Sequence, residues 1–115
     1  MNIAAAVARM PRAQLFLLGG LYHSASETFL SEAALRGLDG LGIGKAFISA
    51  GGVHLRRGVT CSNFNEVAVK RAVLARAERA WLVVDGSKLG QVRTARFADV
   101  GQFEAILSDT EAPVF

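Results

Sequence analysis

Short, continuous apolar runs, separated by segments of helical periodicity, constrain the fold of this sequence more than any other feature. The runs are AQLFLL at 13–18, KAFIS at 45–49, AWLVV at 80–84 and EAILS at 104–108. Each run is too short for a buried helix, and the runs lack the polar alternation of a half-exposed strand. They therefore predict strands of a sheet that is covered on both faces.

Helical periodicity fills the segments between the runs. Apolar residues share one face at 26–38, and at 64–79 they recur every three to four residues. Residues 2–10 indicate a helix that stops before Pro11, and 91–100 indicates a short edge strand with a turn. This order of elements predicts an α/β fold with a mainly parallel sheet, crossover connections and helices on both faces.

The chain has the length of one domain. Its 115 residues and 12.2 kDa leave no room for a second one, so we expect a single domain over residues 1–115. Its apolar stretches are too short to span a bilayer, and its first residues lack the pattern of a signal peptide. The lone Cys61 excludes an internal disulfide framework and fits a reducing compartment. We expect a cytoplasmic protein without membrane contact.

The charge and the reactive side chains favour a small anionic ligand. A net charge of +3 falls short of the basic stripe that nucleic-acid modules show, so small phosphorylated ligands fit better than DNA. His23 and His54 lack partners at metal-ligand spacing, and Cys61 fits a packed thiol better than a nucleophile. We expect no metal and no cofactor. Arg93 and Arg96 are either solvated charges or face an anion.

Glycine-bearing turns follow three of the predicted strands. They hold Gly19 and Gly20, Gly51 and Gly52, and the segment from Asp85 to Lys88. In an open parallel sheet, ligands bind at the carboxyl ends of the strands. Glycine there lets the backbone approach a ligand and frees amide donors for an anion. The alternative, that glycine only permits a tight turn, stays open.

The stretch SNFNEVAVK at 62–70 starts the most regular predicted helix. Asn63 and Glu66 have the spacing of a capping-box variant, and Glu66 with Lys70 has the spacing of a helix-surface ion pair. The functional alternative is that Asn65 and Glu66 face a ligand from the first turn of the helix. Both interpretations stand at the level of sequence.

The ordered motifs GG, AGGV, GVTCSNFNE, VK and DGSK carry a family likeness. Over residues 1–109 the chain resembles the carboxyl-terminal effector-sensing domain of DeoR-family bacterial transcriptional repressors, and it is most similar to the regulators of deoxyribonucleoside catabolism. The resemblance implies a fold related to ribose-phosphate isomerases and CoA transferases. It also implies that the amino-terminal part of the sheet and a DNA-binding winged helix lie upstream, so that this chain is a truncated sensor domain.

In function, the resemblance implies a sensor that binds a phosphorylated sugar, by subgroup analogy a deoxyribose phosphate. Binding would weaken operator binding by the full-length repressor. The motifs and strand ends together select the following ligand-binding residues: Gly20, Gly51, Gly52, Asn65, Glu66, Lys70, Asp85, Ser87 and Lys88. We expect no catalysis.

Two alternatives remain. One is a sugar-phosphate isomerase in which Glu66 or Asp85 is the general base and Lys88 stabilises an enediolate. The other is a homo-oligomer that covers apolar surface left open by the incomplete sheet.

Overall fold

The computed structural model describes residues 2–18, 21–23, 28–30 and 32–110. The chain divides into two compact units, Met1–Asp39 and Gly40–Phe115. The prediction of a single domain over residues 1–115 remains a prediction. Among the described residues, no helix has the length and apolar character needed to cross a membrane.

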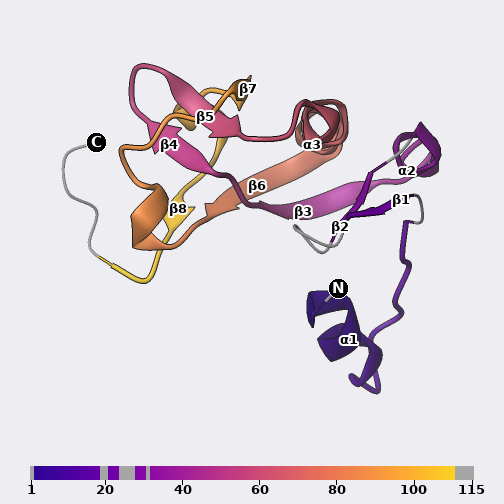
Figure 1. Cartoon of the computed structure of the whole chain (residues 1–115). Coiled ribbons are helices and arrows are strands. Elements are labelled where there is room, and N and C mark those ends of the chain that lie inside the picture. Colours follow the sequence, from indigo (N-terminus) through magenta and orange to yellow (C-terminus); the bar gives the residue numbers. More distant parts are fainter. Residues whose placement is uncertain (1, 19–20, 24–27, 31, 111–115) are drawn as a thin grey trace. The chain divides into compact units, whose positions relative to one another are not determined.

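The first unit holds helix α1 (Asn2–Ala8), the antiparallel pair β1 (Leu21–His23) and β2 (Thr28–Leu30), and helix α2 (Glu32–Gly37) (Figure 1). Helix α1 confirms the helix predicted before Pro11.

Two predictions for the first unit are wrong. Residues 13–18 form no strand, and the Phe16 side chain is 76% exposed. An apolar run becomes a strand only when a neighbouring strand pairs with its backbone N–H and C=O groups. The helix predicted at 26–38 is shorter than its periodicity suggests. Thr28–Leu30 pairs with Leu21–His23 instead, as fits a β-branched and an aromatic residue, and the helix covers only Glu32–Gly37.

A parallel sheet organises the second unit. It contains β3 (Ile43–Ile48), β6 (Ala77–Val83) and β8 (Ile106–Leu107) in the order β3-β6-β8. Phe47 lies opposite Trp81, and Leu82 lies opposite Ile106. The strands predicted at 45–49, 80–84 and 104–108 and the α/β class with a parallel sheet are thus confirmed.

The helix predicted at 64–79 is confirmed in part. A 3₁₀ turn, η1 (Phe64–Glu66), leads into α3 (Val67–Arg76), and the chain becomes extended at Ala77. The prediction ran past this point because Ala77 and Ala80 continue the helical spacing. Pairing of Ala77 with Ile43 and of Arg79 with Lys45 draws these residues into β6.

An antiparallel sheet, β4-β5-β7, packs beside the parallel one. Its strands are β4 (Gly52–His54), β5 (Gly58–Cys61) and β7 (Ala95–Ala98), and β7 confirms the edge strand predicted within 91–100. The β4–β5 hairpin was not predicted. Its turn ends at Gly58, whose φ of +84° is a conformation that side chains disfavour.

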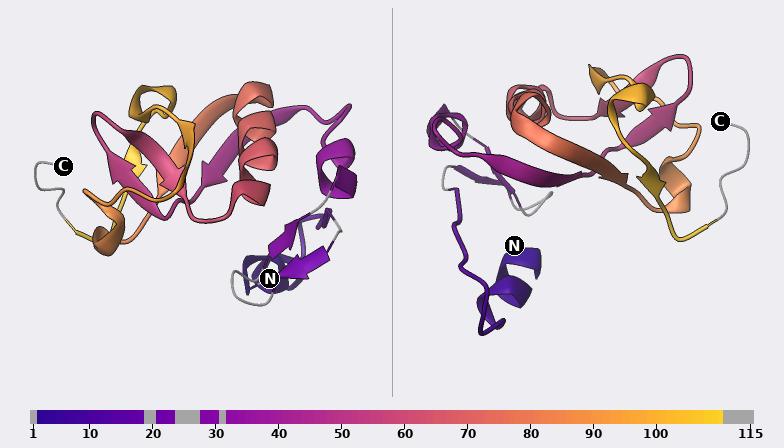
Figure 2. Two further views of the ribbon diagram at one scale, coloured as in Figure 1. Left: turned by 45° about the horizontal axis from the view of Figure 1, so that its top comes forward. Right: turned by 180° about the vertical axis from the view of Figure 1, so that it is seen from behind.

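The core of the second unit lies where the two sheets and α3 meet. Val53, Val59 and Leu82 have no exposed surface, and Phe97 and Phe103 close the same cluster. Helix α3 contacts β3, β6 and β7 (Figure 2). This packing brings the start of α3 to the carboxyl end of β3.

Candidate functional site

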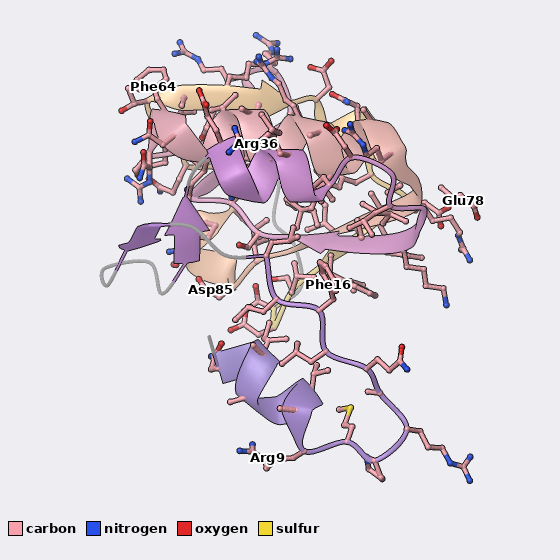
Figure 3. All side chains as sticks on the ribbon, turned by 90° about the vertical axis from the view of Figure 1, so that its right-hand side faces the viewer. Arg9, Phe16, Arg36, Phe64, Glu78 and Asp85 are labelled. Atoms are coloured by element: carbon pink, nitrogen blue, oxygen red, sulfur yellow. The ribbon has the colours of Figure 1, made fainter. Side chains whose placement is uncertain are left out.

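Polar residues follow all three strands of the parallel sheet. Ser49 follows β3 and Asp85 lies just beyond β6, while Ser108 and Asp109 follow β8. In Figure 3, Glu78 at the start of β6 and Asp85 beyond its end lie on opposite sides of the second unit. The carboxyl edge of the sheet, where ligands bind in open parallel sheets, is therefore its polar edge.

Asp85 caps the short helix η2 (Gly86–Lys88). Its Oδ1 accepts hydrogen bonds from the Ser87 amide, at 2.9 Å, and from the Ser87 hydroxyl. The Ser87 hydroxyl, followed by the Ser87 amide, lowers the pKa of Asp85 below its ordinary value. Asp85 is thus an exposed, ionised acceptor whose orientation is set by Ser87, and Lys88 completes the same turn.

Asp109 is a polar residue of this edge that the sequence prediction missed. Its Oδ1 accepts from the Gly86 amide at 2.8 Å and from the Ser108 hydroxyl at 3.3 Å. Asp85 and Asp109 border one cavity of about 350 Å³, lined by Val83, Val84, Asp85, Leu107, Ser108 and Asp109. The available signal was its place directly after the fourth apolar run, equivalent to that of Asp85 after the third.

Lys70 reaches the same edge from α3. Its Nζ donates to the Ser49 carbonyl oxygen at 2.6 Å and lies 4.9 Å from the centre of the Phe97 ring. Burial lowers the pKa of Lys70, and the Glu66 carboxylate opposes this shift. The ammonium has three donors, so the bond to Ser49 leaves two for other acceptors.

The start of the helix is capped differently from the predicted box. The Asn63 side chain accepts from the Asn65 amide at 2.9 Å, and the Glu66 amide donates to the Asn63 carbonyl at 3.1 Å. Glu66 occupies the N-cap position of α3 without a side-chain capping bond. Asn63 is therefore the capping residue of η1, while Asn65 is exposed and Glu66 is half-buried.

Gly51 and Gly52 lie beside the segment that follows Lys88. The Gly90 amide donates to the Val53 carbonyl at 2.8 Å, and Arg93 Nε donates to the Gly51 carbonyl at 3.2 Å. A Cβ on Gly52 would lie 2.4 Å from the Gln91 carbonyl oxygen. Glycine at 52 thus allows a close approach of the chain to itself, which favours the packing alternative there.

The structure gathers five of the nine predicted ligand-binding residues into two groups, and Gly51, Gly52 and Asn65 belong to neither. Asp85, Ser87 and Lys88 share the η2 turn, and Lys70 with Glu66 lies at the junction of α3 and β3. Gly20 lies outside the described residues. Burial raises the pKa of the Cys61 thiol, which donates to the Asn63 carbonyl at 3.5 Å. Among the residues that the structure describes, no group of three or more His, Cys, Asp or Glu side chains is placed to hold a metal ion.

Comparison with known proteins identifies the family. Residues 1–110 match the family model of the DeoR C-terminal sensor domain. The chain is 37% identical over 109 residues to the deoxyribose operon repressor of Escherichia coli K12, covering 95% of this chain and 43% of that protein.

Two more distant relatives agree. Identity is 30% over 98 residues to the lactose phosphotransferase system repressor of Streptococcus mutans, covering 85% of this chain and 39% of that protein. The chain is 27% identical over 108 residues to the HTH-type transcriptional regulator IolR of Bacillus subtilis, covering 94% of this chain and 43% of that protein.

The chain thus spans less than half the length of these curated relatives. They are named as repressors and regulators of transcription, and the matched family is a sensor domain rather than an enzyme. The predicted resemblance is confirmed: this chain belongs to the DeoR C-terminal sensor-domain family, with a regulatory, effector-sensing role.

Proposed function

We propose that this domain binds a phosphorylated sugar at the carboxyl edge of the β3-β6-β8 sheet, and that binding relieves DNA binding by the full-length protein. The observation that carries the proposal is the cavity bordered by Asp85 and Asp109, with Lys88 in the same turn as Asp85. The name of the Escherichia coli relative makes a deoxyribose phosphate the first ligand to test.

The two carboxylates suit the hydroxyls of the sugar. Ser87 bonds to Oδ1 of Asp85, and Gly86 and Ser108 bond to Oδ1 of Asp109. These bonds fix both side chains and leave Oδ2 of each to accept from a sugar hydroxyl.

The phosphate requires cations and amide donors. Lys88 supplies an ammonium, and a charge-assisted hydrogen bond to a phosphate oxygen is about twice as strong as a neutral one. Lys70 retains two donors beyond its bond to Ser49. The cations hold the phosphate, while the carboxylates select the polyol.

A thermal-shift series tests this function. The melting temperature is measured for this chain and the full-length protein with 2-deoxyribose 5-phosphate, ribose 5-phosphate and unphosphorylated deoxyribose. A ligand at 100 times its Kd should stabilise the protein by about 2.7 kcal/mol. We expect a shift with a sugar phosphate that is lost in Lys88→Ala and Asp85→Asn.

Arg56→Ala is the matched control, because Arg56 is an exposed cation in the β4–β5 turn. It should retain the full shift. The proposed site is wrong if no sugar phosphate raises the melting temperature of either protein. It is also wrong if Arg56→Ala reduces the ligand-induced shift as much as Lys88→Ala does.

Self-association is the second part of the proposal. The outer face of the parallel sheet presents Phe47, 64% exposed and stacked on Trp81, together with Val83 and Leu107. Apolar surface of this kind favours a homo-oligomer. Light scattering should give a mass above that of one chain, which Phe47→Ser lowers. A monomeric mass at high concentration would contradict it.

A further inference from the structure

A second cavity lies between α3 and β7 and shares no lining residue with the first. Its volume is about 320 Å³, and it is lined by Arg71, Leu74, Ala75, Arg96, Phe97, Ala98 and Gln102. This size is at the lower end of small-molecule sites. The site proposed above makes no use of these side chains.

Arg71 gives this cavity its charge. Its Nη2 donates to the Arg96 carbonyl at 3.0 Å, and its Nε lies 3.5 Å from the Phe97 carbonyl. Both acceptors are neutral, and in the described part of the chain Arg71 forms no ion pair with a carboxylate. The guanidinium is thus held against β7 with Nη1 unused and its charge uncompensated.

Arg96 and Gln102 are the other polar residues of the lining. Arg96 donates through Nε to the Arg57 carbonyl at 3.2 Å and pairs with the Asp99 carboxylate through Nη2. The Asp99 amide donates to Gln102 Oε1 at 2.8 Å. Because Oε1 is engaged as the acceptor, the remaining polar group of Gln102 is its donor amide nitrogen.

We propose that this cavity is a second anion site, which binds the phosphate or carboxylate of a small organic ligand. Arg71, Arg96 and Gln102 line it, and of the two arginines only Arg96 is paired with a carboxylate, that of Asp99. Leu74, Ala75 and Ala98 form an apolar part of the lining that accommodates a short hydrocarbon portion of the ligand. Arginine forks match the planar carboxylate and the phosphate group.

Amide NMR titration of the 115-residue chain tests this proposal. The probes are phenyl phosphate, inorganic phosphate and benzoate at constant ionic strength. We expect saturable shifts of the amides of Arg71, Leu74, Phe97 and the Gln102 side chain. Phenyl phosphate should bind more tightly than inorganic phosphate because of the apolar lining, and the benzoate arm distinguishes a carboxylate source from a phosphate source.

Variants make the test specific. Arg71→Met should weaken binding at least about tenfold, and Gln102→Ala, which also loses the bond from the Asp99 amide, should weaken it by a smaller factor. Arg93→Met is the matched control because Arg93 bonds to Gly51, outside the cavity. Lys88→Ala should retain these shifts while losing the sugar-phosphate response, which separates this proposal from the preceding one.

Three results would overturn the second site. The first is the absence of saturable shifts at these amides with any of the probes. The second is an equal loss of affinity for the probes in Arg93→Met and Arg71→Met, which would indicate attraction by the overall positive charge rather than a site. The third is a response confined to Asp85–Lys88, which would place the anion at the sheet edge alone.

Discussion

The side-chain ammonium of Lys70 donates a 2.6 Å hydrogen bond to the carbonyl oxygen of Ser49, which ties α3 to the carboxyl end of β3. Lys70 also lies over the Phe97 ring of β7, so one cation joins the helix to both sheets. Its burial makes the charged form less favourable than in the unfolded chain.

Lys70 should make stability depend on alkaline pH. Burial lowers its pKa from the ordinary 10.5, so between the lowered pKa and 10.5 the unfolded state binds more protons. Stability therefore rises with pH in this window. Urea unfolding of the Cys61→Ala variant from pH 8 to 10.5 should show this rise without the opposing contribution of the thiol, and adding Lys70→Met should abolish it.

Cys61 should contribute the opposite slope. Burial raises the pKa of its thiol above 9.0, so above pH 9.0 the unfolded state loses the proton first and stability falls until the folded pKa is passed. Cys61→Ala should remove the fall and leave the rise due to Lys70. Identical pH profiles for the wild type and both variants would contradict this assignment.

Gly52→Ala should destabilise the second unit, and Gly51→Ala should cost less. A Cβ at 52 would lie 2.4 Å from the Gln91 carbonyl oxygen, whereas at 51 the nearest atom, at 3.0 Å, is Cγ of the flexible Arg93 side chain. Overpacking of this kind costs about 1–3 kcal/mol. The urea concentrations at the midpoints of unfolding compare the stabilities of the two variants. Equal losses would show that the approach of Gln91 does not require glycine.

Ser87→Ala should raise the pKa of Asp85. The Ser87 hydroxyl is the main cause of the lowered pKa of that carboxylate, and the Ser87 amide bond would remain in the variant. The stabilisation from ionised Asp85 is present above its unfolded pKa and is lost as pH falls through its folded pKa. Carbon NMR titration measures the shift. Glu104, whose pKa Arg79 lowers, is the internal control and should not move.

Phe47→Ala should destabilise the parallel sheet by about 1 kcal/mol through loss of its stacking on Trp81. The ring centres are 5.3 Å apart at 17°. Trp81 is the single tryptophan, so its fluorescence reports unfolding directly. Leu55→Ala, also exposed but in the β4–β5 turn, is the control and should leave the midpoint unchanged. Equal effects would show that the ring contact contributes nothing.

Local pattern was sufficient where burial and periodicity agreed. The runs at 45–49, 80–84 and 104–108 became parallel strands, and the helix in 64–79 formed over Val67–Arg76. Alternation of these elements allows few topologies, so the α/β class could be derived from the sequence. The DGSK turn was also identifiable, because it follows a buried strand directly.

Other features depended on which segments pair. Residues 13–18 have the composition of a strand but pair with no strand among the described residues. Ala77 leaves the helical pattern because it pairs with Ile43 of β3. Hydrogen-bonding partners distant in sequence leave no local trace. The β4–β5 hairpin was missed for another reason: its partners, such as His54 and Gly58, are close in sequence, but strands of three and four residues are too short for alternation to be recognised.

The sequence by itself determined the family, the α/β class and the polar turn at Asp85, because each depends on residue types at short spacing. Only the tertiary structure brought Asp109 beside Gly86, set Gly52 against Gln91, and placed Arg71 and Gln102 around one cavity. The physical reason is that hydrogen bonds, close contacts and desolvation act between atoms that are near in space, and the pairing of the strands and the packing of the helix decide which distant residues become neighbours.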